Sequence, residues 1–190
     1  SEMPEFKSKT QKLFKEFDRF GKQLMQAVSI HLNLDSNYFD GLIDEGNSVL
    51  RAIHYPPIIS KELGDRSGAH GDINLITLLI GGHKPGLEIL KENKWIPAET
   101  GQETILCNVG DMLERFTNNQ LPSAIHRVTS DSDKIKNTSR YSIPFFLHPN
   151  PDWLIETLAS CIDEANPNLY KESILADDFL QQRLYEIKLL

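Results

Sequence analysis

The amino-acid sequence predicts a mainly β fold, a barrel or jelly roll, with helices at both ends of the chain. Two observations carry this prediction. The middle of the chain holds several short segments rich in β-branched and aromatic residues, separated by Gly, Pro, Asn and Asp. Both ends instead repeat apolar residues at the three- and four-residue spacing of a helix. Because helical patterns do not alternate with the strands, βαβ units are not expected.

The first element is a long amphipathic helix, predicted over residues 5 to about 32. Apolar residues and His31 share one face, and lysines and glutamates occupy the other. Asp35 or Ser36 is then placed to cap a short helix that runs through Gly41. The recurring positions of the long helix are Phe6, Leu13, Phe17, Phe20, Leu24, Val28 and His31.

Six strands are predicted in the middle of the chain, because each segment is short, rich in β-forming residues and bounded by turn residues. The clearest turn is Gly81–Gly86, and the polar stretch Thr129–Ser139 is expected to form a loop. The six segments are Ser48–Tyr55, Ile73–Ile80, Leu87–Leu90, Thr104–Val109, Ala124–Thr129 and Arg140–Leu147.

Helical spacing returns after Pro151, over Trp153–Ile162 and Asp177–Leu190. With 190 residues and 39% hydrophobic content, the chain is long enough for one compact domain and short for two. We therefore expect a single domain with a helical lead-in over 5–41, a β core over 48–150 and C-terminal helices over 151–190.

The charge balance and the cysteine count exclude several classes of function. The 27 acidic and 20 basic residues give a net charge of −7, opposite in sign to that of a typical nucleic-acid-binding protein. The longest apolar runs are far too short to cross a bilayer, and the first residues show no signal-peptide pattern. Two cysteines, Cys107 and Cys161, make no disulfide framework, so a cytoplasmic location is expected. The oligomeric state stays open.

His70-Gly71-Asp72 is a candidate metal-binding motif. Residues two apart on a strand point to the same side, so His70 and Asp72 could share one ion. His126, in a later predicted strand, would supply a third ligand. Two histidines and one carboxylate that leave further positions open are the ligand set of non-haem Fe(II) oxygenases. Taken singly, each histidine is more often structural, His70 in a turn and His126 in a strand.

Arg140 and Ser142 form a second pair that shares one side of a strand. The arginine fork suits a carboxylate, and a serine hydroxyl adds a further hydrogen bond. Tyr55 contributes a phenol that could reach the same anion. The alternative interpretations are a solvent-facing charge for Arg140 and a core aromatic for Tyr55.

Several motifs follow one another between residues 48 and 150. They are Leu50–Pro57, Gly68–Asp72 with Leu75–Leu79, Pro85–Ile89 with Lys94–Pro97, Asn108–Glu114 with Thr117 and Asn118, Ile125–Val128, and Arg140–Phe146. In order and spacing these motifs resemble the isopenicillin N synthase-like family of Fe(II)/2-oxoglutarate-dependent oxygenases.

This resemblance implies a double-stranded β-helix that binds Fe(II) through the two histidines and the aspartate. Arg140 and Ser142, helped by Tyr55, would hold the distal carboxylate of 2-oxoglutarate. The implied activity is that of a non-haem iron dioxygenase, which oxidises a C–H bond of a small-molecule substrate with O2 and releases succinate and CO2. Ascorbate is a further candidate cofactor.

Strand alternation extends the site toward a substrate. If Arg140 faces the interior, Phe146 does too, and it becomes a candidate substrate-facing aromatic. Arg51 shares a face with Tyr55 and would place a cation near the pocket, which suits an acidic substrate. His54 should then point away. Core packing for Phe146 and a surface ion pair for Arg51 are the alternatives.

Three other interpretations stay open. The chain could be an isopenicillin N synthase-type oxidase that uses no 2-oxoglutarate, with Arg140 and Ser142 on a substrate carboxylate. It could be a non-catalytic binding module on the same fold. A zinc hydrolase would share the metal ligands but would leave Arg140 and Ser142 unexplained. Family members usually carry a further N-terminal region before the long helix, and we expect that region to be absent here.

Overall fold

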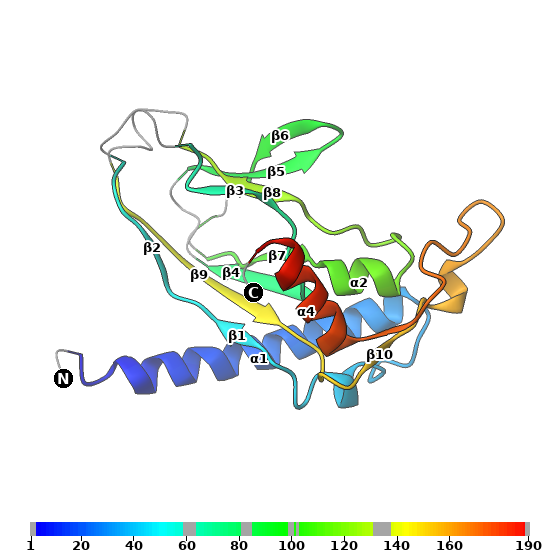
Figure 1. The fold of residues 1–190 in the computed structure, drawn as a ribbon. Coiled ribbons are helices and arrows are strands. Elements are labelled where there is room, and N and C mark those ends of the chain that lie inside the picture. Colours follow the sequence, from blue (N-terminus) through cyan, green and yellow to red (C-terminus); the bar gives the residue numbers. More distant parts are fainter. Residues whose placement is uncertain are drawn as a thin grey trace.

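The computed structural model describes residues 3–58, 64–80, 85–98, 101, 103–130 and 138–188. The long helix α1, a main β-sheet and a second β-sheet are stacked in that order, and the C-terminal elements lie at one end of the stack (Figure 1). The fold is mainly β with flanking helices, the jelly roll expected from the sequence. The predicted turn Gly81–Gly86 and loop Thr129–Ser139 fall largely outside the described residues.

The N-terminal helix prediction is confirmed by α1 (Phe6–His31). The residues that it buries recur every four positions and form one stripe, which packs on strand β9 of the main sheet. The ring of Phe17 stacks on Phe145 of β9, with 5.5 Å between the ring centroids. The buried stripe consists of Phe17, Gly21, Met25 and Ser29.

The prediction of a short helix after α1, ending at Gly41, is wrong. Only a 3-10 turn forms, Asp40–Leu42, and no side chain caps it. The ring of Phe39 is completely buried against Phe116 and Trp153. The Phe39 ring therefore anchors this turn in the hydrophobic core.

The main sheet has strand order β1-β9-β4-β7, and β2 also pairs with β9. Every pairing in it is antiparallel. The predicted strand Ser48–Tyr55 is split at Arg51 and Ala52, and both halves keep one register against β9. The strands are β1 Val49–Leu50, β2 Ile53–Tyr55, β4 Ile76–Ile80, β7 Leu106–Val109 and β9 Arg140–Leu147.

The second sheet has strand order β3-β8-β5-β6 and is also antiparallel. Strands β5 and β6 form the hairpin that projects from the top of the molecule in Figure 1. Strands β3 and β8 carry the histidines of the candidate metal motif. The bounds are β3 Ser67–His70, β5 Leu87–Lys91, β6 Lys94–Pro97 and β8 His126–Val128.

The two faces of β9 serve different purposes. Ile143, Phe145 and Leu147 belong to the hydrophobic core that α1 covers. Arg140 and Ser142 alternate with Tyr141, so the buried polar residues share one face and Tyr141 the opposite one. Strand β9 therefore separates the packed helix layer from the candidate site.

The prediction of a helix over Trp153–Ile162 is wrong. The structure has strand β10 (Leu154–Ile155) and a 3-10 turn, Ala159–Cys161, in its place. Trp153, Ile155 and Thr157 are buried while the residues between them are exposed. That two-residue period is typical of an extended chain. β10 pairs with β11 (Ile174–Leu175), and the last helix is α4 (Ala176–Glu186).

One helix was not predicted as such. α2 (Asp111–Phe116) follows β7 directly and buries Met112, Leu113 and Phe116. Among the described residues, no helix is long and apolar enough to cross a membrane.

Candidate metal centre

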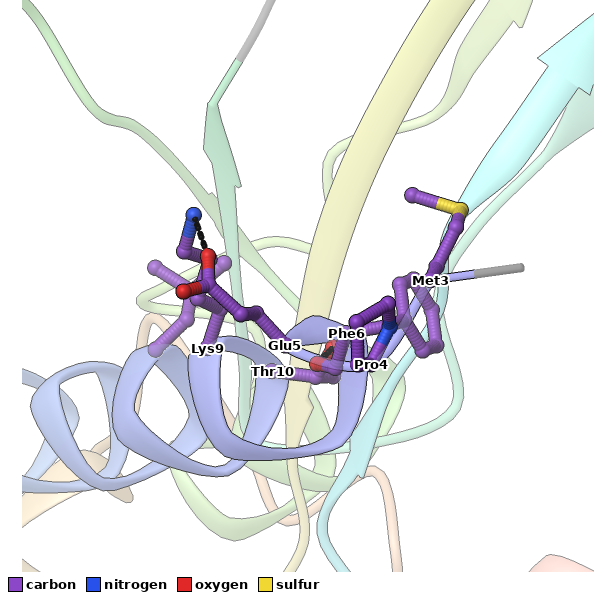
Figure 2. Close-up of a pocket in the computed structure, with 7 residues that line it drawn as sticks. Met3, Pro4, Glu5, Phe6, Lys9 and Thr10 are labelled. Carbon is purple, nitrogen blue, oxygen red and sulfur yellow. Dashed lines mark hydrogen bonds and ion pairs between the residues drawn. The ribbon is translucent and has the colours of Figure 1, made fainter. Parts of the chain in front are cut away.

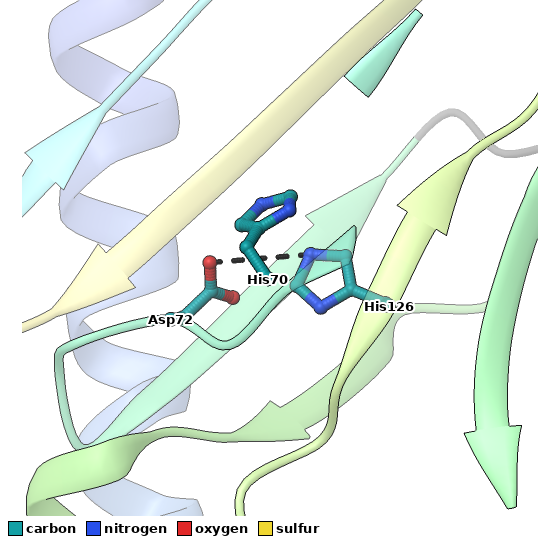
Figure 3. A group of neighbouring side chains, drawn as sticks. All are labelled: His70, Asp72 and His126. Atoms are coloured by element: carbon teal, nitrogen blue, oxygen red, sulfur yellow. Dashed lines mark ion pairs between the residues drawn. The ribbon is translucent and has the colours of Figure 1, made fainter. Parts of the chain in front are cut away.

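The three predicted metal-binding side chains meet at one point (Figure 3). β3 and β8 pair in a register that sets His70 directly opposite His126, and their ring centroids lie 4.4 Å apart. Asp72 follows two residues after His70, just beyond the end of β3. One potential ligand atom from each residue lies within 4.8 Å of the others. The structure therefore brings together the three side chains named from the sequence, and their role as metal ligands stays a prediction.

Backbone hydrogen bonds fix the orientation of both imidazole rings. Nδ1 of His70 donates to the carbonyl of Gly68 at 2.7 Å, and Nδ1 of His126 donates to the carbonyl of Ala124 at 2.8 Å. Each bond leaves Nε2 with a lone pair. Nε2 of His126 lies 4.0 Å from Oδ1 of Asp72. Metal-binding histidines are oriented in the same way, because the ring nitrogen that does not bind the metal donates a hydrogen bond to a carbonyl or carboxylate.

The carboxylate of Asp72 is suited to a cation. Its side chain is 6% exposed, and its buried Oδ2 has no hydrogen-bond partner among the residues that the structure describes. A buried carboxylate oxygen without a donor is costly, and a metal ion at the cluster would satisfy it. Two imidazole nitrogens and one carboxylate oxygen fit a divalent iron that keeps open positions. His70 is exposed, so the cluster is open on its side.

The predicted anion-binding residues lie together on the inner face of the main sheet. Tyr55 of β2 is the direct partner of Arg140, and Ile53 that of Ser142. Arg140 is buried, 1% exposed. Its burial lowers the pKa of Arg140, while the nearby Tyr55 acts to raise that pKa. A buried guanidinium beside a phenol and a hydroxyl can bind a carboxylate.

Arg66 is a residue that the sequence analysis missed. Its Nη2 donates to the carbonyl of Thr138 at 2.7 Å, next to the start of β9, and its charge lowers the pKa of Arg140. Arg66 therefore adds a second cation at this end of the sheet. Strand alternation could not have identified Arg66, because a register shift between Ser67 and His70 interrupts the alternation along β3.

The candidate substrate residues are placed by the same register. The N–H of Arg51 donates to the carbonyl of Pro144 at 3.0 Å, which continues the β1 and β2 pairing and puts Arg51 on the face of Phe146. Arg51 is exposed and Phe146 is half-buried. His54 points the other way and stacks on the exposed Tyr141, at 4.6 Å between ring centroids.

Arg127 also turns away from the cluster. Its guanidinium pairs with Glu88 at 2.7 Å and lies over the ring of Trp95. Arg127 follows His126 in β8 and therefore lies on the opposite face of the strand, where these contacts form.

A separate hollow of about 450 Å³ lies beside the first turns of α1 (Figure 2). Met3 and Phe6 line it, and Glu5 and Lys9 form an ion pair at 2.7 Å on its edge. None of the residues that line it belongs to the metal cluster or the anion-binding group. This hollow is therefore not the candidate site.

Comparison with known proteins agrees with this arrangement. The sequence model described as the 2OG-Fe(II) oxygenase superfamily matches residues 46–149, which include the metal cluster, Tyr55, Arg140 and Ser142. The chain belongs to this superfamily. A crystal structure of a 2OG-Fe(II) oxygenase family protein from Caulobacter crescentus is 46% identical, with a TM-score of 0.90. The match covers 98% of this chain and 61% of that one.

Two further relatives show the spread of the superfamily. A protein of Neurospora crassa, solved in complex with alpha-KG and thymine, is 30% identical, with a TM-score of 0.88 over 98% of this chain and 58% of that one. A 2-oxoglutarate-Fe(II) type oxidoreductase of Aspergillus fumigatus is 31% identical over 87% of this chain and 49% of its own length. The chain spans about half the length of the curated relatives that it matches.

Proposed function

We propose that this protein is an Fe(II)- and 2-oxoglutarate-dependent oxygenase that oxidises a C–H bond of a small molecule. The reaction consumes the substrate, O2 and 2-oxoglutarate, and yields hydroxylated substrate, succinate and CO2. One observation carries the proposal: the His70, Asp72 and His126 cluster occurs in a fold that also buries Arg140 beside Tyr55. The first group suits the metal and the second suits the co-substrate.

His70, Asp72 and His126 would hold the iron, which when bound supplies the chemistry with O2. The hydrogen bonds from Nδ1 keep both rings aimed at the cluster, so little reorganisation is needed when the metal enters. Asp72 supplies the negative charge that a divalent cation requires. Because His70 is exposed, the ion would keep an open side for further ligands.

Arg140, Ser142 and Tyr55 would bind the distal carboxylate of 2-oxoglutarate. The arginine can make two parallel hydrogen bonds to it, and the two hydroxyl groups can each add one. Burial strengthens these bonds, because water does not compete for the guanidinium. This binding would orient the co-substrate with its keto acid toward the metal cluster.

We further propose that the substrate is a small acid and that Arg51 and Phe146 line its site. Arg51 supplies a cation and Phe146 an aromatic face on the side of β9 that carries Arg140. The thymine complex of the Neurospora crassa relative supports a small flat ligand in this fold. Membership of the isopenicillin N synthase-like branch and a cytoplasmic location are proposed with it, the latter because both cysteines are free thiols.

The test is an anaerobic titration with Fe(II), then with 2-oxoglutarate, followed by succinate analysis after O2 is admitted. We expect H126A to lose most of its Fe(II) affinity, and H54A, an exposed histidine on the other face, to retain it. Wild-type protein that binds Fe(II) but forms no succinate with any small acid would favour an oxidase without 2-oxoglutarate. Absence of Fe(II) binding would favour a binding module.

Arg140 gives a sharper test of the co-substrate site. R140Q should weaken 2-oxoglutarate binding by about 2 to 3 kcal/mol, roughly 30- to 150-fold, because a buried charged partner of the carboxylate is lost. Its Fe(II) affinity should stay unchanged. Y141F alters the adjacent residue, which points outward and is 64% exposed, and serves as the control. Equal 2-oxoglutarate affinity in R140Q and wild type would contradict the assigned role.

A further inference from the structure

We propose that Arg183, on the C-terminal helix α4, is a positioning residue for the iron site. It would act through Asp111, the first residue of α2, on the turn that carries Asp72. The inference rests on the proposed iron site and extends it to a helix that supplies none of the ligands. Three contacts link Arg183 to that turn.

The first contact joins the backbone of α2 to the metal turn. The N–H of Asp111 donates to the carbonyl of Asp72 at 2.8 Å, and the N–H of Met112 donates to the carbonyl of Ile73 at 3.2 Å. The first amides of a helix have no acceptor within the helix, so such partners satisfy them. These two hydrogen bonds tie the first turn of α2 to the backbone of Asp72 and Ile73.

The second contact joins the Asp111 side chain to Gly71, between His70 and Asp72. A Cβ atom on Gly71 would lie 2.8 Å from Oδ1 of Asp111 and 2.7 Å from Oγ of Ser123. The carboxylate is therefore packed directly against the turn. Any movement of the Asp111 side chain would change the space available to the turn at Gly71.

The third contact is the ion pair between α4 and α2. Nη2 of Arg183 lies 3.2 Å from Oδ2 of Asp111, whose side chain is only 12% exposed. α4 itself is anchored by Ala176 and Phe179 in the hydrophobic core. Without Arg183, a nearly buried carboxylate beside the metal turn would lose its counter-charge. It would then move toward water, and the turn would move with it.

The expected effect is on metal binding rather than on folding alone. Removal of groups that orient metal ligands typically weakens metal affinity 10- to 100-fold. Because Arg183 acts through Asp111, we expect the lower end of that range, about tenfold. Asp111→Asn should have a similar effect, since it removes the same ion pair with a side chain of equal size.

The experiment is an anaerobic Fe(II) titration of the wild-type chain, R183Q, D111N and R183K. R183Q and D111N should each bind Fe(II) about tenfold more weakly, and the double variant no more weakly than either. R183K should recover most of the affinity, because it keeps the charge. E186Q removes the other partner of Arg183 and R19Q an exposed pair on α1, so both should bind as wild type does.

Hydrogen exchange gives a readout that a purely structural role would not move. If α4 and the iron site are coupled, Fe(II) must slow amide exchange in α4 of the wild type, since coupling is reciprocal. In R183Q that slowing should disappear. D111N tests the same pair from α2, so the result does not depend on the folding of R183Q.

Two results would overturn the inference while the proposed function stands: Fe(II) affinity within twofold of wild type in R183Q and D111N, or a lower melting temperature with unchanged affinity. If the wild-type protein binds no Fe(II), the proposed function fails and this inference fails with it. The two failures are therefore distinguishable.

Discussion

Gly71 is the residue on which the metal turn depends most directly. It lies between two proposed ligands, and side chains from α2 and from the segment before β8 fill the space where a Cβ would lie. Gly68, three residues earlier in β3, has nothing within 4 Å of the corresponding position. The two glycines therefore form a matched pair within one short segment.

We predict that G71A lowers the free energy of unfolding by about 1 to 3 kcal/mol, because the new methyl overpacks a filled space. It should also weaken Fe(II) binding. G68A should change neither quantity measurably. Urea unfolding and metal titration of both variants provide the check, and equal behaviour of the two would contradict the packing seen at Gly71.

Residue spacing, together with the family resemblance of the motifs, was enough to name some residues of the candidate site and not the rest. His70, Asp72 and His126, and the Tyr55 and Arg140 pair, were found because strand alternation and motif order are local signals. Arg66, Asp111 and Arg183 were not. Their positions depend on which distant segments pack together. The local sequence of one segment does not show that packing.

At the scale of elements, α1 supports the site from behind. Its ring stack on β9 holds the outer face of the strand whose inner face carries Arg140. Phe145 is completely buried, stacks on Phe17, and meets Phe14 edge-on at 5.1 Å between ring centroids.

We expect F145A to cost about 3 to 5 kcal/mol of unfolding free energy, because it leaves a cavity between α1 and β9. Phe6, at the exposed start of α1, offers the control, since F6A removes a ring that is already 53% exposed. Urea unfolding of both variants measures the difference. A loss below about 1 kcal/mol for F145A would show that the α1 and β9 contact is not a main source of stability.

Element types were predictable where one period dominated the sequence. The long helix and most strands agree with prediction for that reason. Trp153–Ile162 was misassigned because its apolar residues satisfy both periods, and its pairing with a segment near residue 174 decided the outcome. The short α2 was missed because six residues give too little periodicity to recognise.

For the whole molecule, His148 links stability to pH. Burial lowers the pKa of His148 from 6.5 to about 4, with Asp72 opposing the shift. His148 and Asp177 of α4 both line one small cavity. Because the folded pKa lies below the unfolded one, the unfolded chain binds the extra proton more readily. The stability that neutral His148 contributes is therefore present above about pH 6.5, and this contribution is lost as the pH falls toward 4.

We predict that this group alone reduces the unfolding free energy of the metal-free protein by on the order of 2 to 3 kcal/mol between about pH 7 and pH 4. H148Q should flatten the pH dependence by that amount, and H31Q, at the exposed end of α1, should leave it unchanged. Urea unfolding at several pH values measures both. The same slope in H148Q and wild type would contradict the assignment.

The pairing of His70 with His126 has a consequence for the chain as a polymer. In sequence, β4, the β5–β6 hairpin, β7 and α2 all lie between these two residues, yet the residues face each other across one strand pair. An ion held by both would cross-link the two ends of this long loop, much as a disulfide does. Loss of the ion would then release a constraint on the whole intervening segment.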